Sequence, residues 1–514
     1  MSPLGVLAAS LQDVLVEPVE QFVIPSVDWA AIAPNLILML GGILLLTVVS
    51  VLKRRVPAWF APVWTISAAV AAGCAVVPLW QRFLDSGPET LIGGAVGLDG
   101  FSLFATVVVC ISVVFASLLL ADYLQRESLE SPEWYVLILL SASGAVTMAS
   151  ADDLIVLFVG LEILSVAAYV LTAMHRRRMS SQEAGLKYFV LGAFSSAFLL
   201  YGIALTYGAT GSTNLAEIQG FLSTDVVTQN ALLLGGLALM LVGFGFKIAA
   251  VPFHAWAPDV YQGAPTPIAG YMAGAVKVGA FAALLRVFVV AFGPAYAGEW
   301  RPLVAALAVL SLVVGAFGAI AQTNVKRMLA YSSINHAGFI LLGVLAASPA
   351  GTEAALFYLL AYTFMAAGSF AVVTVVGRTG EHHQSLEDYR GLASLRPGLA
   401  LTFTVLLLSQ AGVPLTVGFL AKLYVVIAVE ESGFDWVAVV AMLTAVVSAF
   451  MYLRIVATMF FGEAPEGATR LRIPAATGLA LALSLVGVIG LGIVPGPVSD
   501  WANDAVAQLV VAAP

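Results

Sequence analysis

Six basic side chains and one glutamate fall inside long apolar stretches of this chain. The basic residues are Lys187, Lys247, Lys277, Arg286, Lys422 and Arg454, and the acid is Glu162, in the middle of the run 154–173. If these stretches cross a membrane, each charge at mid-depth costs about 2.5–3.5 kcal/mol. Such residues persist where they pair with one another, line water or carry protons.

Some of these charges have a simpler explanation. Arg454 and Lys187 lie near the cytoplasmic ends predicted for their helices, and Arg286 could reach the outer interface, so their long stems could extend to the headgroup layer. Lys277 and Glu162 lie too far inside their helices for this. For these two residues the pattern favours a functional role.

The choice of lysine indicates the chemistry. The chain has only six lysines, and four of them lie within apolar stretches. A desolvated lysine can lose its proton near neutral pH, whereas arginine stays charged in nearly any site. A row of buried lysines with a glutamate is therefore suited to moving protons, and a purely structural ion-pair network would not need titratable lysines.

Two of the five histidines lie close to this row. His254 follows Lys247 by seven residues, and His336 lies within the apolar run 328–346. Both could relay protons, and a hydrogen-bonded structural role is an equal alternative. His382 and His383 fall in a charged loop and His175 in the basic sequence HRRR, where no specific role is expected.

The composition identifies the solvent around these residues. Of 514 residues 61% are hydrophobic and 10% are charged, whereas soluble chains are about 25% charged. This excludes a soluble enzyme, a disordered chain and a nucleic-acid binder. Cys74 and Cys110 lie in apolar runs and support neither a disulfide framework nor a metal site.

The apolar stretches predict an all-α polytopic membrane protein with a single membrane domain, residues 1–514. The fourteen predicted spans are 30–52, 60–80, 101–121, 134–150, 154–173, 184–207, 231–251, 266–293, 302–321, 328–346, 353–377, 398–430, 436–460 and 473–497. With both termini outside, cytoplasmic loops receive fourteen Lys and Arg and outer loops two. Residues 1–29 read as an interfacial segment without a cleavable signal peptide, and 473–514 as a terminal helix and tail.

Two stretches are too long for one span and contain helix breakers. Pro252 interrupts 231–263, and Gly412 and Pro414 interrupt 398–430. Paired broken helices are typical of inverted repeats in transporters. We therefore predict two five-helix repeats of opposite orientation, helices 4–8 (134–293) and helices 9–13 (302–460).

Several sequence blocks resemble the antiporter-like subunits of respiratory complex I, the proton-pumping NADH:quinone oxidoreductase. They include FKIAAVPFHAWAPDVYQGAPTPIAGYMAGAVKVGAF (246–281), GLEILSVAAYVL (160–171), QTNVKRMLAYSSINHAGF (322–339) and GVPLTVGFLAKLYVV (412–426). Among the paralogues, WAPDVYQGAPTP and the lysine at 422 are similar to the N type. The resemblance runs along most of the chain.

The resemblance implies a proton path through the centre of the membrane. By match to the family motifs, Glu162 and Lys247 would form the input-side charge pair, with Lys187 modulating it. Lys277 would be the central connecting lysine, and Lys422 would release protons outward.

The resemblance also implies a setting. The chain would be a translocase subunit of a bacterial cell membrane, beside the neighbouring antiporter-like subunit M and the small subunits K and J. It would hold no cofactor and do no redox chemistry, because flavin, iron–sulfur clusters and quinone would belong to partner subunits. No phosphate-binding GxxxxGK motif, metal-spaced Cys/His cluster or nucleotide fingerprint is present. The alternatives are a subunit of a multi-chain cation/proton antiporter and a structural membrane subunit that does not pump.

Overall fold

The computed structural model describes residues 26–52, 56–224, 230–464 and 471–506. Most of the predicted interfacial segment 1–29 and the end of the predicted tail lie outside these residues. The first part of the chain forms α2 (Ala33–Leu52), α3 (Phe60–Ser86), the antiparallel hairpin β1 (Glu89–Leu91) and β2 (Val96–Leu98), α4 (Gly100–Glu127), α5 (Glu133–Ser150), α6 (Leu154–Ala173), α7 (Met179–Thr210), α8 (Leu215–Thr224), α9 (Asn230–Lys247) and α10 (Trp256–Gly263).

A single long helix follows, made of α11 (Thr266–Tyr271), the π-helical turn η2 (Met272–Val276), α12 (Lys277–Leu285) and a second π-helical stretch, η3 (Arg286–Ala291). The remaining elements are α13 (Gly293–Ile320), α14 (Val325–Ala346), α15 (Pro349–Gly377), η4 (Thr379–Glu381), η5 (Leu386–Tyr389), α16 (Leu392–Leu395), α17 (Pro397–Ala411), α18 (Val417–Glu431), α19 (Asp435–Phe461), α20 (Ala475–Ile493) and α21 (Gly496–Val506).

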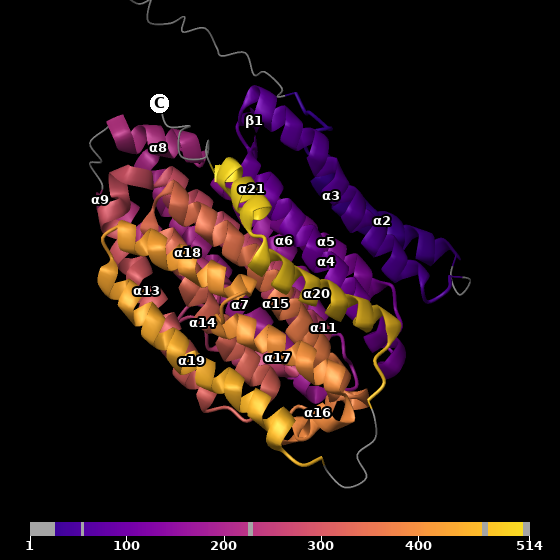
Figure 1. Cartoon of the computed structure of the whole chain (residues 1–514). Coiled ribbons are helices and arrows are strands. Elements are labelled where there is room, and N and C mark those ends of the chain that lie inside the picture. The colour runs from indigo at the N-terminus through magenta and orange to yellow at the C-terminus, as the bar shows by residue number, and fades with distance from the viewer. Residues whose placement is uncertain (1–25, 53–55, 225–229, 465–470, 507–514) are drawn as a thin grey trace, which may run out of the picture.

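Thirteen helices in the described ranges are long and apolar enough to cross a membrane. Each coincides with one of the fourteen predicted spans. The one predicted span without such a helix, 398–430, is divided into α17 and α18. The prediction of an all-α polytopic membrane protein is therefore confirmed. In Figure 1 the long helices run side by side, with α2 and α3 at one edge of the bundle and α13 and α19 at the other. The helix Thr266–Ala291, α14 and α15 are the most buried spans and form its centre.

Polar side chains fix where several of these helices begin. Asp153 accepts hydrogen bonds from the backbone N–H groups of Ile155 and Val156 at the start of α6, and Asn324 accepts one from Arg327 at the start of α14. Side-chain acceptors at this position satisfy donors that have no partner within the helix. The apolar runs therefore begin as helices at defined residues.

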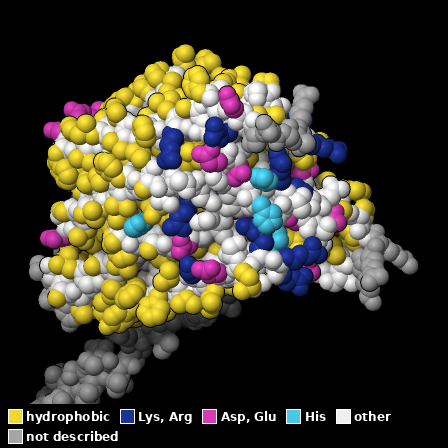
Figure 2. Space-filling model, turned by 90° about the horizontal axis from the view of Figure 1, so that it is seen from below, with side chains coloured by type: hydrophobic (Ala, Val, Ile, Leu, Met, Phe, Trp, Pro, Cys, Tyr) yellow, Lys and Arg dark blue, Asp and Glu magenta, His cyan; other side chains and the backbone are white. Residues whose placement is uncertain are grey.

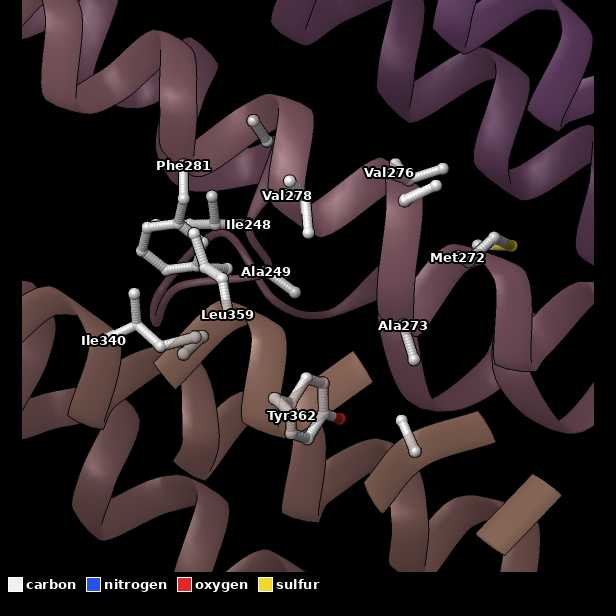
Figure 3. Packing of buried hydrophobic residues seen from close by; sticks show 14 of the residues in the cluster. Ile248, Ala249, Met272, Ala273, Val276, Val278, Phe281, Ile340, Leu359 and Tyr362 are labelled. Atoms are coloured by element: carbon white, nitrogen blue, oxygen red, sulfur yellow. The ribbon is translucent and has the colours of Figure 1, made fainter. Parts of the chain in front are cut away.

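Both predicted helix breaks are present. The chain leaves helical geometry between Lys247 and Trp256, around Pro252, and again between Ala411 and Val417, where Gly412 has a φ of 95°. Ile248 and Ala249, at the first break, are buried and lie near Phe281, Ile340 and Leu359 (Figure 3). Non-helical backbone at membrane depth is tolerated where protein surrounds it in this way.

Two matching backbone bridges support the predicted internal repeat. Asp153 pairs with Asn214 and Asn324 pairs with Ser385, so each residue of the second bridge lies 171 positions after its counterpart. The first bridge directly precedes α8 and the second lies shortly before α16, and these two helices are at opposite ends of the bundle (Figure 1). This arrangement is expected of units in opposite orientation, while the bounds 134–293 and 302–460 remain a prediction.

The predicted cytoplasmic loops meet at one end of the bundle. Arg178 pairs with Glu381, Arg126 donates to the Thr374 carbonyl, and Arg396 donates to the Leu471 carbonyl. We call this end the Arg-rich face, formed by the loops that carry Arg126, Arg176–Arg178, Arg327, Arg378–Arg396 and Arg472. Figure 2 shows basic, acidic and histidine side chains gathered on it between hydrophobic flanks.

Candidate functional site: a row of buried lysines

Lys247 is the last residue of α9 and is buried directly before the first break. Its ammonium donates to Ser165 Oγ at 2.7 Å and to the Tyr188 hydroxyl at 3.4 Å. The same nitrogen lies 5.3 Å from the ring centres of Tyr169 and Tyr188. Hydroxyl groups and aromatic rings from α6 and α7 therefore surround this charge.

Glu162 lies on α6 three residues before Ser165, on the same face of that helix. Within the described residues no ion pair joins it to Lys247, and its buried Oε1 has no hydrogen-bond partner. The charge pair implied by the family resemblance is therefore not a direct contact in this structure. The two groups share one neighbourhood through Ser165.

Lys187 lies apart from the buried lysines, in the first third of α7. It pairs with Glu183 at 2.7 Å and with Asp259 at 2.9 Å, and its side chain is 42% exposed. Asp259 also pairs with Arg327 at 2.5 Å. Lys187 thus belongs to a half-exposed network at the Arg-rich face, one residue before Tyr188, which contacts Lys247.

Lys277 follows the π-helical turn η2 and is buried at the centre of the bundle. Its Nζ donates to the carbonyl oxygen of Ser333 at 2.7 Å and to Ser333 Oγ at 2.5 Å. The extra residue in a π turn rotates all later side chains about the helix axis, and such turns are frequent at functional sites. The turn η2 therefore determines which way Lys277 points.

His336 lies on α14, the helix whose Ser333 contacts Lys277 and whose Phe339 contacts Lys422. Its Nδ1 and Nε2 lie 2.7 Å and 3.2 Å from the hydroxyl groups of Tyr358 and Tyr452. The ring of Tyr362 is 4.8 Å from the imidazole and 5.0 Å from Lys277 Nζ. Both histidine nitrogens are engaged, so both roles left open by the sequence, relay and structural hydrogen bonding, fit this geometry.

Lys422 lies on α18 just after the second break. Its Nζ donates at 2.9 Å to the carbonyl oxygen of Ala411, which is the last residue of α17. The same nitrogen lies 4.8 Å from the ring centre of Phe339. The break itself thus supplies the acceptor, because a carbonyl at a helix end has no partner within the helix. Gly412 at the break leaves room for the lysine stem: an added Cβ there would come within 3.1 Å of Lys422 Cδ.

His254 lies in the first break, close to Tyr331, with a ring-centre separation of 6.5 Å. Its Nδ1 is buried, and no described residue forms a hydrogen bond with it. The structure brings this histidine next to α14, although it does not contact Lys247.

Two other charges inside the bundle, Arg286 and Arg454, have partners of different kinds. Arg286 donates to Asp99 at 2.6 Å and to Asp152 at 2.8 Å. Both aspartates lie in loops predicted on the outer side, so Arg286 reaches that end of the bundle, where it is buried. Burial raises the pKa of Asp152 to about 6, with the charge of Arg286 acting in the opposite direction. Arg454 donates to the carbonyls of Ile320 and Gln322 at the end of α13, which agrees with its predicted reach toward the cytoplasmic interface.

Sequence reasoning missed one buried cation, Lys326, which it placed in a loop. The side chain is fully buried and pairs with Glu381 at 3.1 Å, and Arg178 pairs with the same carboxylate at 2.5 Å. Burial would raise the pKa of Glu381, but Lys326 and Arg178 outweigh it and hold that pKa below its usual value. Glu381 lies 55 residues after Lys326 in the sequence, so no local pattern could have indicated this pairing.

The hydroxyl partners of the row were also missed, for a different reason. Ser165, Ser333 and Tyr452 lie in apolar helices where serine and tyrosine are common. Only their positions relative to the lysines single them out. The sequence spacing of Lys247, Ser165 and Ser333 contains no such information.

Together these elements define a class: a polytopic membrane protein with two broken helices and a row of buried basic groups that are held by hydroxyl, carbonyl and aromatic partners. A family model described as NADH:quinone oxidoreductase/Mrp antiporter, TM matches residues 151–448, more than half of the chain. The chain belongs to this family.

Similar proteins and solved structures agree with this family membership. The chain is 41% identical to NADH-quinone oxidoreductase subunit N of Trichlorobacter lovleyi over 94% of its length and 97% of the relative's. It is 43% identical to subunit N 2 of Roseiflexus castenholzii, over 93% and 97%. A chain of respiratory complex I from Thermus thermophilus, solved with bound Aureothin, superposes with a TM-score of 0.75 at 34% identity, over 91% of this chain and 98% of that chain.

Proposed function

We propose that this chain is a membrane-arm subunit of a proton-translocating NADH:quinone oxidoreductase in a bacterial cell membrane. It moves protons along the buried row formed by Glu162, Lys247, Lys277, His336 and Lys422, with His254 and Lys187 beside it. The relatives named subunit N support this assignment. Electron transfer belongs to partner subunits, and subunits M, K and J are the expected neighbours. Both termini lie on the non-cytoplasmic side, which makes the Arg-rich face cytoplasmic.

The observation that carries the proposal is the kind of partner each buried lysine has. In the described part of the chain, Lys247, Lys277 and Lys422 have no carboxylate partner and instead donate to hydroxyl or carbonyl oxygens. A lysine paired with a carboxylate is held charged, as Lys326 is by Glu381. An ammonium held only by neutral oxygens loses far less interaction energy when it becomes an amine than one held by a carboxylate does. It can therefore give up and regain a proton.

The test replaces Lys247 with alanine in the intact complex and reconstitutes it into vesicles. We expect assembly and NADH oxidation to persist while protons moved per NADH oxidised fall sharply. Arg390→Gln is the matched control, because this exposed cation on the Arg-rich face pairs only with Glu387 among the described residues. Normal pumping by Lys247→Ala would contradict the proposal and favour a structural subunit.

Purification distinguishes the antiporter alternative. Isolation with flavin- and iron–sulfur-containing chains supports the oxidoreductase assignment. Isolation only with other hydrophobic antiporter chains would refute it, since that composition belongs to a complex driven by ion gradients.

A further inference from the structure

A cavity of about 240 Å³ lies at the Arg-rich face between the ends of α4 and α15 and the start of α20. Three arginines line it, Arg126, Arg378 and Arg472, together with the hydroxyl-bearing Thr379 and Thr477. One carboxylate, Asp122, is present as well. The cavity is separate from the row of buried lysines.

Among the described residues, the one carboxylate that lines the cavity is already engaged. Asp122 Oδ2 accepts hydrogen bonds from the backbone N–H of Thr477 at 2.7 Å and from its hydroxyl at 2.8 Å, in the first turn of α20. In the described part of the chain, neither Arg378 nor Arg472 is paired with a carboxylate, and both are exposed. The cavity therefore carries an excess of positive charge.

Arg126 is held so that part of its guanidinium stays unused. Its Nε donates to Glu127 at 3.0 Å, its Nη1 donates to the Thr374 carbonyl at 2.6 Å, and its guanidinium lies over the ring of Tyr123. Its Nη2 is buried and has no hydrogen-bond partner among the residues that the structure describes. A fixed guanidinium with a free donor is well suited to phosphate oxygens, which accept several such bonds.

The cavity lies where a phospholipid headgroup would be. It adjoins the first residues of α20, a span candidate that is largely exposed and presents Leu479, Leu483 and Val486 outward. Basic pockets at the cytoplasmic ends of membrane helices bind anionic headgroups, and the apolar flank of α20 would take the acyl chains. An acidic segment of a partner protein would have no use for this apolar flank.

From these contacts we propose that the cavity lined by Arg126, Arg378 and Arg472 binds the phosphate of an anionic phospholipid and so fastens α20 to α4 and α15. Inorganic phosphate has the same chemistry but lacks acyl chains. The site is independent of the proposed proton row.

The purified native complex is first exchanged into nanodiscs that contain phosphatidylglycerol. Native mass spectrometry then measures the lipid that the complex retains in detergent. The variant is Arg378→Gln with Arg472→Gln, which leaves the bonds of Arg126 intact. Each basic side chain near an anionic lipid strengthens binding about fivefold, so the double variant should bind phosphatidylglycerol about 25-fold more weakly. Arg390→Gln, on the same face but outside the cavity, should retain the lipid.

The remaining arms distinguish the sources of phosphate. Retention of phosphatidylglycerol, loss in the double variant and recovery in Arg378→Lys with Arg472→Lys support the proposal. Binding of radiolabelled inorganic phosphate without lipid retention would overturn the lipid assignment. Equal retention by the double variant and the native chain, or a protein segment filling the cavity in the intact complex, would overturn it as well.

Discussion

Replacing Lys422 with arginine separates the charge of this residue from its ability to release a proton. The native ammonium donates to the Ala411 carbonyl and lies over the ring of Phe339. A guanidinium can form both interactions, so the charge, the hydrogen bond and the cation–π contact are kept. Folding and assembly should therefore be preserved.

The expected effect follows from the difference between the two side chains as acids. The reference pKa of arginine lies about 2–3 units above that of lysine, and each unit corresponds to about 1.4 kcal/mol. Forming the neutral base at position 422 then requires about 3–4 kcal/mol more in the same surroundings. If proton release through this residue limits pumping, the coupled rate falls by a hundredfold or more.

The assay records proton movement and NADH oxidation together in vesicles containing the intact complex. Lys422→Gln serves as the comparison, because it removes both the charge and the proton exchange. If the residue exchanges protons, the arginine and glutamine variants are impaired alike. Pumping at the native rate by Lys422→Arg, with only the glutamine variant impaired, would show that a fixed charge suffices and would refute the reasoning.

Three further changes test contacts elsewhere in the fold. Arg286→Gln leaves the buried Asp99 and the partly buried Asp152 without their cation and should destabilise the chain by about 3–5 kcal/mol. A lower unfolding temperature in detergent would show this, and an unchanged temperature would contradict the pairing. Glu381→Gln should destabilise similarly at neutral pH. Because the pKa of Glu381 is lowered in the folded chain, the difference in stability from the native chain should begin to shrink as the pH falls below about 4, the ordinary pKa of a glutamate, and should disappear only when the pH reaches the lowered pKa of the folded chain. Gly412→Ala, at a φ of 95°, should cost about 1–3 kcal/mol by the same thermal assay, whereas Gly398→Ala, where an added Cβ meets open space, should have no such effect.

Much of the fold could be predicted because lipid imposes strict length and composition rules. An apolar helix must be long enough to cross the bilayer, and every predicted span has a helical counterpart. Pro252 and Gly412 also have strong local effects, so both breaks were visible in the sequence. These features depend only on residues close together in the chain.

The partners of the buried charges could not be predicted, and they decide what each charge does. Lys277 and Lys326 are both buried lysines of one chain. Lys277 donates to Ser333, while Lys326 pairs with Glu381. Burial disfavours the charged form in both cases, but a carboxylate offsets that penalty only by keeping the lysine protonated. A hydroxyl group can form a hydrogen bond with lysine in either protonation state, because it can both accept and donate. The distinction between a structural cation and a carrier of protons therefore depends on whether the tertiary fold brings a carboxylate within hydrogen-bond distance of the lysine. The sequence pattern indicates burial but does not indicate that partner.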